Sequence, residues 1–571
     1  MKPHKPEIVN DALRRHLSLS VRAEDLENFG ELFVDPSIFD STFNNSNQIV
    51  FGTRGSGKTS LLGGLTAQPI AQGAHGKILC LLFSTQDFLV SPPPDPTLPQ
   101  PKALAFAYFQ TFVRKLVEEL EKHVTAILDT PYVVEILMRL GKSQRSQIED
   151  KMLQILELTD EGEPFWYPPS SRVKLIERTD TRETKESGTQ LGATTSFSSV
   201  GGPIVAAQGG IRGSRKGRKD LRLSRAREAD GHMVFRVSSI RKRLLDIIDL
   251  LGLDFVLVCI DEWMALDPLA ETDVQPEFAE LLKRFLFNTG KVGVKIASNR
   301  YQTRLLSGEK GTGHRGMEID ADIFYAANLD WAILSETELE GFYEELLVKR
   351  LIRCRSDIAT EYRDSQDPVY PHHALIDSIY KDRRAFRELI HGAQGIPRDF
   401  ILYFNDAARA VRCNIAQRQI DHTLVHDCIH ARGLTGRMTE LANVELGEAF
   451  LIRCVKKAVH DSGTELFLVP RIVKCAPYNL AIQQLIRLRL VQEYPEVNLP
   501  SHVHESYKAY IVSYGTFLDW QRSFQYGNTA NAELKYMSYT IPIIKHDDDV
   551  TRYVVKEEWI RQAFRDVENP S

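Results

Sequence analysis

The sequence has few cysteines, no long apolar run and only a small excess of one charge. Its seven cysteines are scattered over 571 residues without a CxxC pair. This spacing argues against a disulfide framework or a zinc site and is typical of free thiols in a reducing compartment. No apolar stretch reaches the roughly 18 residues that span a bilayer, and the first residues lead into no signal-type segment. We therefore expect a cytoplasmic protein with no membrane partner.

The charge balance limits how the chain contacts nucleic acid. A formal net charge of −5 argues against a protein that coats nucleic acid with its whole surface. The exception is a tract at residues 212–227, which carries eight Lys or Arg and one acid, Asp220. Such a tract either contacts phosphates or forms a solvated loop. Any DNA contact is therefore expected to be confined to a patch.

Length and composition predict several globular parts. A chain of 571 residues with 43% hydrophobic side chains exceeds the size at which one core keeps growing. We predict a lead segment at residues 1–45, a core domain at 46–335, a helical lid at 336–436 and a C-terminal domain at 437–571.

Short apolar runs in the core domain predict a parallel sheet. Four runs are nearly continuous and are separated by helical stretches: residues 48–51, 77–83, 254–260 and 292–297. Runs of this kind are typical of strands that are buried on both faces of a sheet. The expected fold is α/β, an αβα sandwich. Between the second and third runs we predict an inserted helical region at 100–160 and a flexible basic insertion at 179–229, rich in Ser and Gly.

The C-terminal domain is predicted to be a winged-helix-like α+β unit. Residues 478–492 have the pattern of a helix. Residues 507–512 and 515–518 alternate around a tight turn, which favours a hairpin. A helix followed by a hairpin indicates a winged helix.

A glycine-rich loop follows the first predicted strand and is followed by a helical segment. It matches G-x-x-x-x-G-K-[ST], a pattern whose backbone N–H groups and helix N-terminus bind phosphates. In this pattern Lys58 reaches the β and γ phosphates, and Thr59 coordinates Mg²⁺. The predicted nucleotide-binding residues are Gly52, Thr53, Arg54, Gly55, Ser56, Gly57, Lys58, Thr59 and Ser60.

Two carboxylates end the third predicted strand, beside the place where the phosphates are expected. Asp261 is predicted to support the magnesium ion, together with Thr59. Glu262 is predicted to polarise the attacking water, a role that distinguishes an ATPase from a nucleotide kinase. The expected cofactors are ATP and Mg²⁺.

Two arginines are further catalytic candidates. Arg300 follows the tip of the fourth strand, where a polar or cationic residue senses the γ-phosphate or stabilises developing charge. Arg398 follows Gly395-Ile396-Pro397, which interrupts the helical lid, and the proline favours the first turn of a new helix. Arg398 is therefore expected to reach the phosphates when the lid closes.

The loop, the two carboxylates and both arginine segments together resemble AAA+ ATPases near the origin-recognition and STAND branches. More narrowly, several segments resemble bacterial proteins described as ORC-like AAA ATPases: Ile260-Asp261-Glu262-Trp263, Gln275-Pro276, Val294-Lys295-Ile296-Ala297 and Gly316-Met317-Glu318-Ile319-Asp320-Ala321-Asp322. The resemblance covers about residues 20–410.

The resemblance implies roles for the candidate residues. Lys58 and Thr59 take Walker A positions, and Asp261 and Glu262 take Walker B positions. Further roles are sensor 1 for Arg300, sensor 2 for Arg398, and an arginine finger acting in trans for Arg304 or Arg315. The chain has no Asn-Lys-x-Asp element for reading guanine, so ATP is favoured over GTP.

Three functions remain open on this basis. The first is an oligomerising ATPase switch whose winged-helix-like domain contacts duplex DNA through Arg487 and Arg489. The second is a STAND-like signalling ATPase of a bacterial anti-phage defence system that acts through a partner effector protein. The third, a nuclease, rests on Asp519 with Glu533 and Lys535, a short pattern that is frequent in charged surface sequence.

Overall fold

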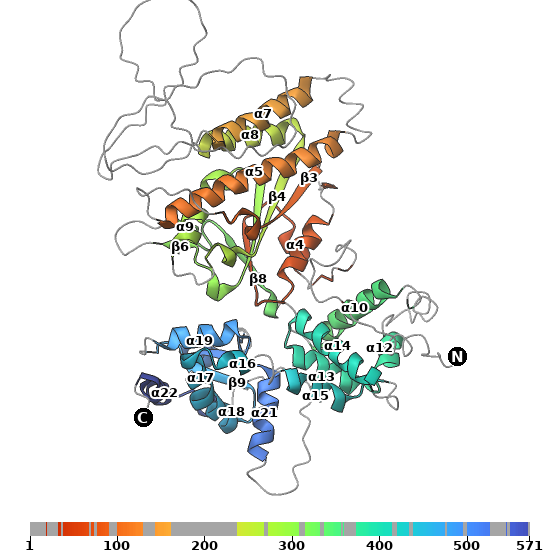
Figure 1. Cartoon of the computed structure of the whole chain (residues 1–571), viewed down its shortest axis with the longest axis vertical. Helices are drawn as coiled ribbons and strands as arrows, with labels where there is room; N and C mark the ends of the chain where they lie inside the picture. The colour runs from red at the N-terminus through yellow and green to blue at the C-terminus, as the bar shows by residue number, and fades with distance from the viewer. Residues whose placement is uncertain are drawn as a thin grey trace, which may run out of the picture. The chain divides into compact units, whose positions relative to one another are not determined.

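The central sheet has six strands in the computed structural model, and four of them lie where the apolar runs predict them. The strands are β1 (Gln48–Phe51), β2 (Ile70–Gln72), β3 (Lys77–Ser84), β4 (Leu253–Asp261), β5 (Val292–Ser298) and β8 (Phe324–Asn328). Their order is β2-β3-β4-β5-β1-β8 (Figure 1). All neighbours run parallel except β2, which is antiparallel to β3. The predicted α/β fold is confirmed; edge strands β2 and β8 were not expected.

The structure describes residues 19, 32, 34–35, 38–67, 70–72, 77–90, 100–128, 143–160, 237–267, 272–307, 315–331, 336–355, 358, 373–413, 419–432, 438–473, 477–494, 499–525, 544 and 549–568. All of these belong to one compact unit, formed by residues 1–160 and 237–571. The predicted basic insertion at 179–229 lies outside the described residues. Among the described helices, none has both the length and the apolar character needed to cross a membrane.

Helices cover both faces of the sheet. On one face, α4 (Lys58–Thr66) packs on β3, β4 and β5, with Leu62 and Leu65 against Cys80 and Cys259. Side chains that alternate with these point the other way, where α8 (Val237–Leu250) packs on β4 and α9 (Val274–Leu286) packs on β5. The sheet is therefore the buried middle layer of a sandwich.

The inserted helical region extends the cover on the second face. It forms α5 (Gln100–Leu128) and α7 (Ser143–Asp160), and α5 packs on α9. Aromatic rings fix α5 in place: Phe112 meets Phe83 of β3 edge-on at 5.4 Å between ring centroids, and Phe109 meets Phe285 of α9 at 5.6 Å. The insertion is thus part of the core domain. Short elements complete this domain: α3 (Phe39–Thr42), η1 (Thr85–Phe88), η2 (Trp263–Leu266), η3 (Arg300–Gln302), β6 (Leu306–Ser307), β7 (Arg315–Gly316) and η4 (Leu329–Trp331).

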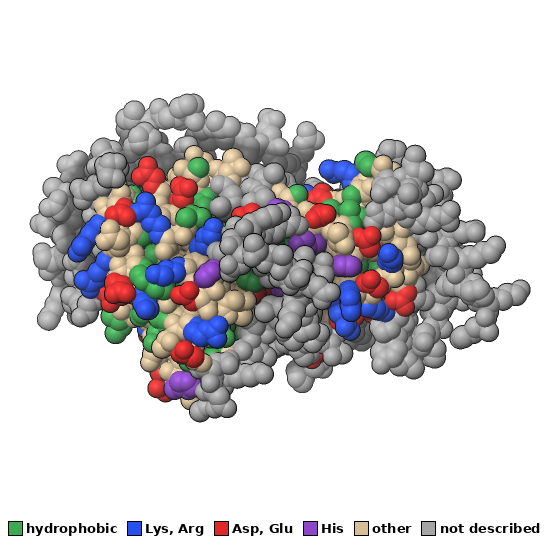
Figure 2. Space-filling model, turned by 90° about the horizontal axis from the view of Figure 1, so that it is seen from below, with side chains coloured by type: hydrophobic (Ala, Val, Ile, Leu, Met, Phe, Trp, Pro, Cys, Tyr) green, Lys and Arg blue, Asp and Glu red, His purple; other side chains and the backbone are tan. Residues whose placement is uncertain are grey.

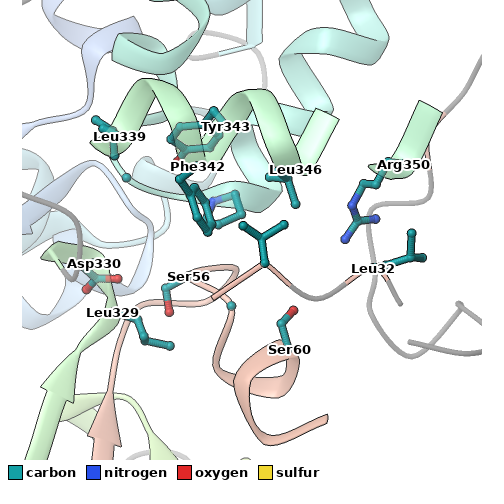
Figure 3. A pocket seen from close by; sticks show the side chains of 14 residues that line it. Leu32, Ser56, Ser60, Leu329, Asp330, Leu339, Phe342, Tyr343, Leu346 and Arg350 are labelled. Carbon is teal, nitrogen blue, oxygen red and sulfur yellow. The ribbon is translucent and has the colours of Figure 1, made fainter. Parts of the chain in front are cut away.

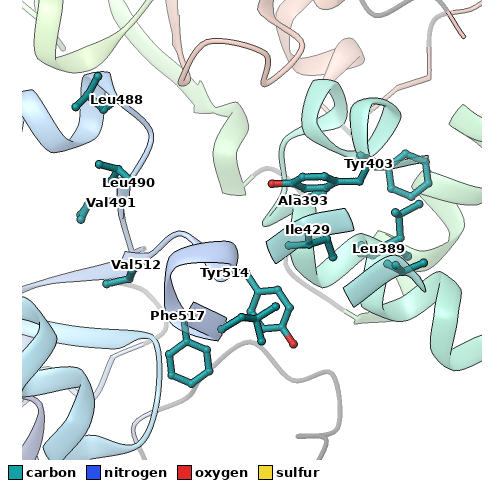
Figure 4. Packing of buried hydrophobic residues seen from close by; sticks show 14 of the residues in the cluster. Leu389, Ala393, Tyr403, Ile429, Leu488, Leu490, Val491, Val512, Tyr514 and Phe517 are labelled. Atoms are coloured by element: carbon teal, nitrogen blue, oxygen red, sulfur yellow. The ribbon is translucent and has the colours of Figure 1, made fainter. Parts of the chain in front are cut away.

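The helical lid and the C-terminal part share one hydrophobic core. The lid helices are α10 (Glu336–Cys354), α12 (His373–Ile379), α13 (Arg383–Ala393), α14 (Pro397–Cys413) and α15 (His422–Arg432). Figure 4 shows Leu389 and Ile429 from the lid in the same cluster as Tyr514 and Phe517 from the C-terminal part. This cluster is continuous from α10 to the last helix.

The C-terminal part combines helices with a three-stranded antiparallel sheet. Its helices are α16 (Met438–Leu441), α17 (Glu445–Phe450), the π-turn η6 (Leu451–Val455), α18 (Lys456–Ser462), α19 (Pro477–Arg487), α20 (Ser501–Ser506), α21 (Tyr514–Gln525), η8 (Val550–Tyr553) and α22 (Glu557–Glu568). Its strands β9 (Leu466–Pro470), β10 (Val491–Glu493) and β11 (Tyr507–Val512) lie in the order β10-β11-β9.

Two details predicted for this part are wrong. Helix 478–492 ends early, because α19 stops at Arg487 and Arg489 adopts a left-handed backbone with φ 57°. Residues 515–518 are not a strand but belong to α21, since Tyr514, Phe517 and Leu518 are buried at helical i, i+3, i+4 spacing. Strand β11 instead pairs with β10, with Val491 opposite Val512, and with β9 on its other side.

A fully buried lysine joins the sheet to the turn that precedes β1. Lys295 of β5 is 0% exposed, and its Nζ donates to Asn44 Oδ1 at 3.0 Å, to the Ser46 carbonyl at 2.8 Å and to Gln48 Oε1. Burial lowers the pKa of Lys295 to about 7 from its ordinary value of 10.5. The three acceptors are neutral, so no described carboxylate contact offsets the cost of burying the charge.

We predict that this lysine makes the stability of the fold depend on pH. Between about 7 and 10.5 the unfolded chain keeps a proton on Lys295 that the folded chain has released. Stability rises with pH wherever the unfolded state binds more protons, so the free energy of unfolding should rise across this window. Denaturant unfolding of the wild type and of Lys295→Met at pH 7, 8 and 9 measures the difference. Parallel pH profiles for the two proteins would contradict the assignment.

Candidate nucleotide-binding site

The glycine-rich loop is folded so that its backbone turns tightly between β1 and α4. Gly55 and Gly57 have φ values of 99° and 101°, a region that glycine adopts without strain. A Cβ atom on Gly52 would lie 2.2 Å from Ser56 Oγ and 3.1 Å from Ser56 Cβ, so a larger residue there would displace Ser56. The Gly52 N–H donates to the Ser298 carbonyl of β5 at 3.2 Å. The loop is thereby anchored to the sheet and ends at the N-terminus of α4, where anions bind.

The side chain of Lys58 lies inside this loop. Its Nζ donates to the carbonyls of Gly52 and Thr53, each at 2.7 Å, and the residue is 7% exposed. Burial lowers the pKa of Lys58, while the charges of Asp330 and Asp261 act in the opposite direction. The lysine is therefore held at the place where phosphates are expected.

Asp261 and Glu262 end β4 and are held by the neighbouring strand. Asp261 is buried and its Oδ1 accepts from the Glu262 N–H at 2.8 Å. Ser84, which pairs with Asp261 in the sheet, donates to Glu262 Oε2 at 3.2 Å, and Thr85 donates to the Glu262 carbonyl at 2.5 Å. Glu262 itself is left-handed, with φ 56°. A strained backbone held by several contacts is common at functional sites.

The lid reaches the loop through Arg398. Its backbone N–H donates to the Gly55 carbonyl at 3.3 Å, from the first turn of α14. A Cβ atom on Gly55 would lie 2.7 Å from Arg398 Cβ. Among the charges that influence the pKa of Lys58 are those of Asp261, Glu262 and Arg398. The structure thus brings these predicted residues together around one lysine.

The side chain of Arg300 pairs with a residue of the C-terminal part. Its side chain is 60% exposed and pairs with Glu493 of β10 at 3.2 Å. The neighbouring Asn299 is 7% exposed and its Oδ1 accepts from the Tyr301 N–H at 3.0 Å. At the tip of β5 the buried polar side chains are therefore Ser298 and Asn299, whereas Arg300 is exposed.

The arginine-finger candidates and the nuclease candidates occupy other places. Arg304 pairs with Asp273 and Arg315 pairs with Glu277, each at 3.1 Å. Asp519 lies 3.6 Å from Nε2 of His430. Glu533 and Lys535 lie outside the described residues.

A pocket opens between the loop and helix α10. It holds about 660 Å³ of empty space, including the part open to solvent. Figure 3 shows Phe342 and Leu346 pointing from α10 toward the side that carries Ser56 and Ser60. The remaining lining residues are Leu32, Val34, Gly57, Leu329, Asp330, Leu339, Tyr343, Arg350, Gly395 and Pro397.

The pocket presents a polar atom that suits a ligand. Ser56 Oγ is buried and makes no hydrogen bond to any residue that the structure describes. Buried hydroxyl groups normally have a partner, and a bound polar group would supply one. Thr59, half-buried at the start of α4, and the Asp261 carboxylate offer the oxygen donors that Mg²⁺ prefers. The residues present therefore fit both a nucleotide and its metal.

Several of these residues were missed in the sequence. Two contacts of the site were not expected: Asp330 accepts hydrogen bonds from Thr53, and Ser84 donates a hydrogen bond to Glu262. The only local signal for Asp330 is its place at the end of the apolar run that forms β8. The pocket wall on α10 carries no motif; its apolar spacing is that of any amphipathic helix.

Comparison with known proteins supports the resemblance in the segment that carries the loop. A family model described as ORC-CDC6-like matches residues 18–84, which contain β1, the loop, α4 and β3. The resemblance to ORC-like AAA+ ATPases is thus confirmed over this segment. No curated protein matches the chain.

Two solved structures have weak overall similarity. A Walker-type ATPase of Pyrococcus abyssi is 10% identical, with a TM-score of 0.36 over 89% of this chain and 99% of that protein. The ORC2 protein of Aeropyrum pernix, solved as ADPNP–ADP complexes, is 12% identical, with a TM-score of 0.18 over 50% of this chain and 69% of that protein. The fold assignment follows from the sheet and the loop rather than from these likenesses.

Proposed function

We propose that this chain is an ATP-binding and ATP-hydrolysing AAA+ molecular switch of the ORC-like type. The observation that carries the proposal is the arrangement of Lys58, Asp261, Glu262 and Arg398 around one phosphate loop. A lysine, two strand-end carboxylates and an arginine from a second domain are the parts that phosphoryl transfer to water needs.

The roles of these residues follow from their positions. The loop N–H groups and the N-terminus of α4 bind the β and γ phosphates. Lys58 exchanges its two carbonyl partners for phosphate oxygens. The buried ammonium group thereby gains negatively charged hydrogen-bond partners. Glu262, held by Ser84, orients and polarises a water for attack on the γ-phosphate. Thr59 and Asp261 would hold a Mg²⁺ ion, which would neutralise phosphate charge when bound.

The pocket beside the loop suits the base and ribose. Its apolar wall consists of Phe342, Leu346 and neighbouring side chains of α10, and its floor includes Ser56 and Ser60. Because α10 belongs to the lid, a bound nucleotide touches both the core domain and the lid. Binding is therefore expected to fix the lid, and loss of the γ-phosphate to release the Arg398 side chain.

We further propose that the switch oligomerises and contacts DNA through its C-terminal domain. Helix α19 followed by the antiparallel β10–β11 pair supports a winged-helix-like unit. Arg487 of α19 is exposed, whereas Arg489 is tied to Asp399 at 2.7 Å. Figure 2 shows Lys and Arg side chains interspersed with Asp and Glu among the coloured residues of the face in view.

The test is ATP turnover with and without duplex DNA. We predict that Lys58→Ala abolishes nucleotide binding, and that DNA stimulation of the wild type falls steeply as salt rises, because phosphate contacts release counterions. Arg487→Gln should reduce the salt slope by about 1. Arg353→Gln, which removes an exposed arginine from α10, is the matched control.

Two outcomes would contradict these assignments. Nucleotide binding that survives Lys58→Ala would overturn the site. Turnover that DNA does not change, together with ATP-dependent assembly only in the presence of a partner protein, would replace DNA association with the signalling role.

A further inference from the structure

A buried carboxylate contacts the second residue of the phosphate loop. Asp330 lies in η4, directly after edge strand β8, and is 8% exposed. The parallel pairing of β8 with β1 places Asn328 opposite Phe51, so the end of β8 lies beside the start of the loop. The Asp330 carboxylate accepts from the Thr53 N–H at 2.8 and 3.1 Å and from Thr53 Oγ1 at 2.9 Å.

Thr53 connects this carboxylate to the lysine. The Thr53 carbonyl accepts from Lys58 Nζ at 2.7 Å. The same residue is therefore held on one side by Asp330 and holds Lys58 on the other. Any rotation of the peptide at Thr53 moves the acceptor that orients the ammonium group.

The main chain of Asp330 meets the lid. A Cβ atom on Gly395, which has φ 79°, would lie 2.6 Å from the Asp330 carbonyl oxygen. Three residues further on, the Arg398 N–H donates to the Gly55 carbonyl. Asp330 thus contacts the loop through its side chain and the lid through its backbone.

We propose that Asp330 is a positioning residue for nucleotide binding. Its carboxylate fixes Thr53, so that the loop and Lys58 keep the conformation that binds phosphates. Its backbone contacts Gly395 of the lid, so that a movement of the lid also moves the loop. Burial raises the pKa of Asp330, while the Thr53 donors lower it, and the charge-assisted hydrogen bonds are of the strong kind. The inference rests on the proposed nucleotide-binding function.

The experiment compares variants at both ends of the contact. Asp330→Ala removes all three hydrogen bonds and is expected to weaken Mg²⁺–ATP binding about tenfold, the loss typical of a buried charged contact. Thr53→Val removes only the hydroxyl contact and should weaken binding less, whereas Thr53→Ser, which keeps the hydroxyl, should bind more tightly than Thr53→Val. Titration calorimetry with Mg²⁺–ATP measures each affinity.

Further readouts separate positioning from general structural damage. Because the loop grips substrate and transition state alike, KM should rise in Asp330→Ala with little change in kcat. Adding Thr53→Val to Asp330→Ala should have no further effect, since the hydroxyl has already lost its partner. Asp322→Asn is the matched control: it breaks an ion pair with Lys283 near β8, away from the loop, and should leave ATP affinity unchanged.

The possible results distinguish the inference from the function on which it rests. If Lys58→Ala binds ATP as the wild type does, the proposed function fails. If Lys58→Ala abolishes binding but Asp330→Ala does not weaken it, only the inference is overturned. The same holds if the effects of Asp330→Ala and Thr53→Val on ATP affinity are additive. Should Asp330→Ala fail to fold, the order of Thr53→Val and Thr53→Ser decides.

Discussion

Replacing Glu262 with Gln is expected to stop ATP turnover while leaving ATP bound. Gln keeps the size of the side chain and still accepts a hydrogen bond from Ser84, so the end of β4 should keep its shape. It cannot take a proton from water, and loss of general-base catalysis lowers rates by about 10²- to 10⁴-fold. Phosphate release measured beside calorimetric ATP binding gives both quantities.

The control for this variant removes a carboxylate that lies outside the nucleotide site. Glu118 is an exposed residue of α5, and among the ion pairs described it pairs only with Lys115. The Glu118→Gln variant should hydrolyse ATP normally. Turnover by Glu262→Gln at the wild-type rate would remove Glu262 from the mechanism. Loss of ATP binding in Glu262→Gln would instead mean that the residue shapes the pocket.

Replacing Gly395 with Ala should be the most damaging glycine substitution at the junction of loop and lid. The left-handed backbone at φ 79° costs a residue with a Cβ about 1 kcal/mol or more. The new Cβ would also press to 2.6 Å from the Asp330 carbonyl, a backbone atom that cannot rotate away. Overpacking of this kind adds about 1–3 kcal/mol. We expect a lower free energy of unfolding and weaker ATP binding together.

Gly463 provides the comparison, since it is left-handed at φ 72° but has nothing within 4 Å of an added Cβ. Gly463→Ala should therefore show the backbone cost alone, with ATP binding intact. Denaturant unfolding and ATP titration of both variants separate strain from collision. Equal effects of the two substitutions on the free energy of unfolding and on ATP binding would mean that the collision with Asp330 contributes nothing measurable.

The sequence predicts the features that are local along the chain. Strands β1, β3, β4 and β5 are continuous apolar runs, and the loop from Gly52 to Thr59 is a contiguous motif with its helix attached. Asp261 and Glu262 follow from their place at a strand end. These features can be recognised in the sequence because each depends on residues that lie within a few positions of one another.

The remainder depends on contacts between distant residues. Asp330 is separated from Thr53 by 277 positions, and no local pattern pairs them. The pairing of Arg300 with Glu493 likewise joins two residues 193 positions apart. In the C-terminal part, Tyr514 to Leu518 fits both an alternating and a helical pattern over so few residues, and only the packing on the lid decides for the helix.

Because the lid and the C-terminal part share one hydrophobic core, we expect them to move together as one rigid body. Buried side chains run without interruption from α10 through α14 and α21 to α22, and closely packed interiors transmit displacement rather than absorb it. A small tilt of α14 at the phosphate loop would therefore be amplified with distance, and the far end would travel furthest. Cutting the chain at residue 436 would not release a working lid, because it would remove α21, on which α13 and α15 pack, and half of the buried side chains of this shared core.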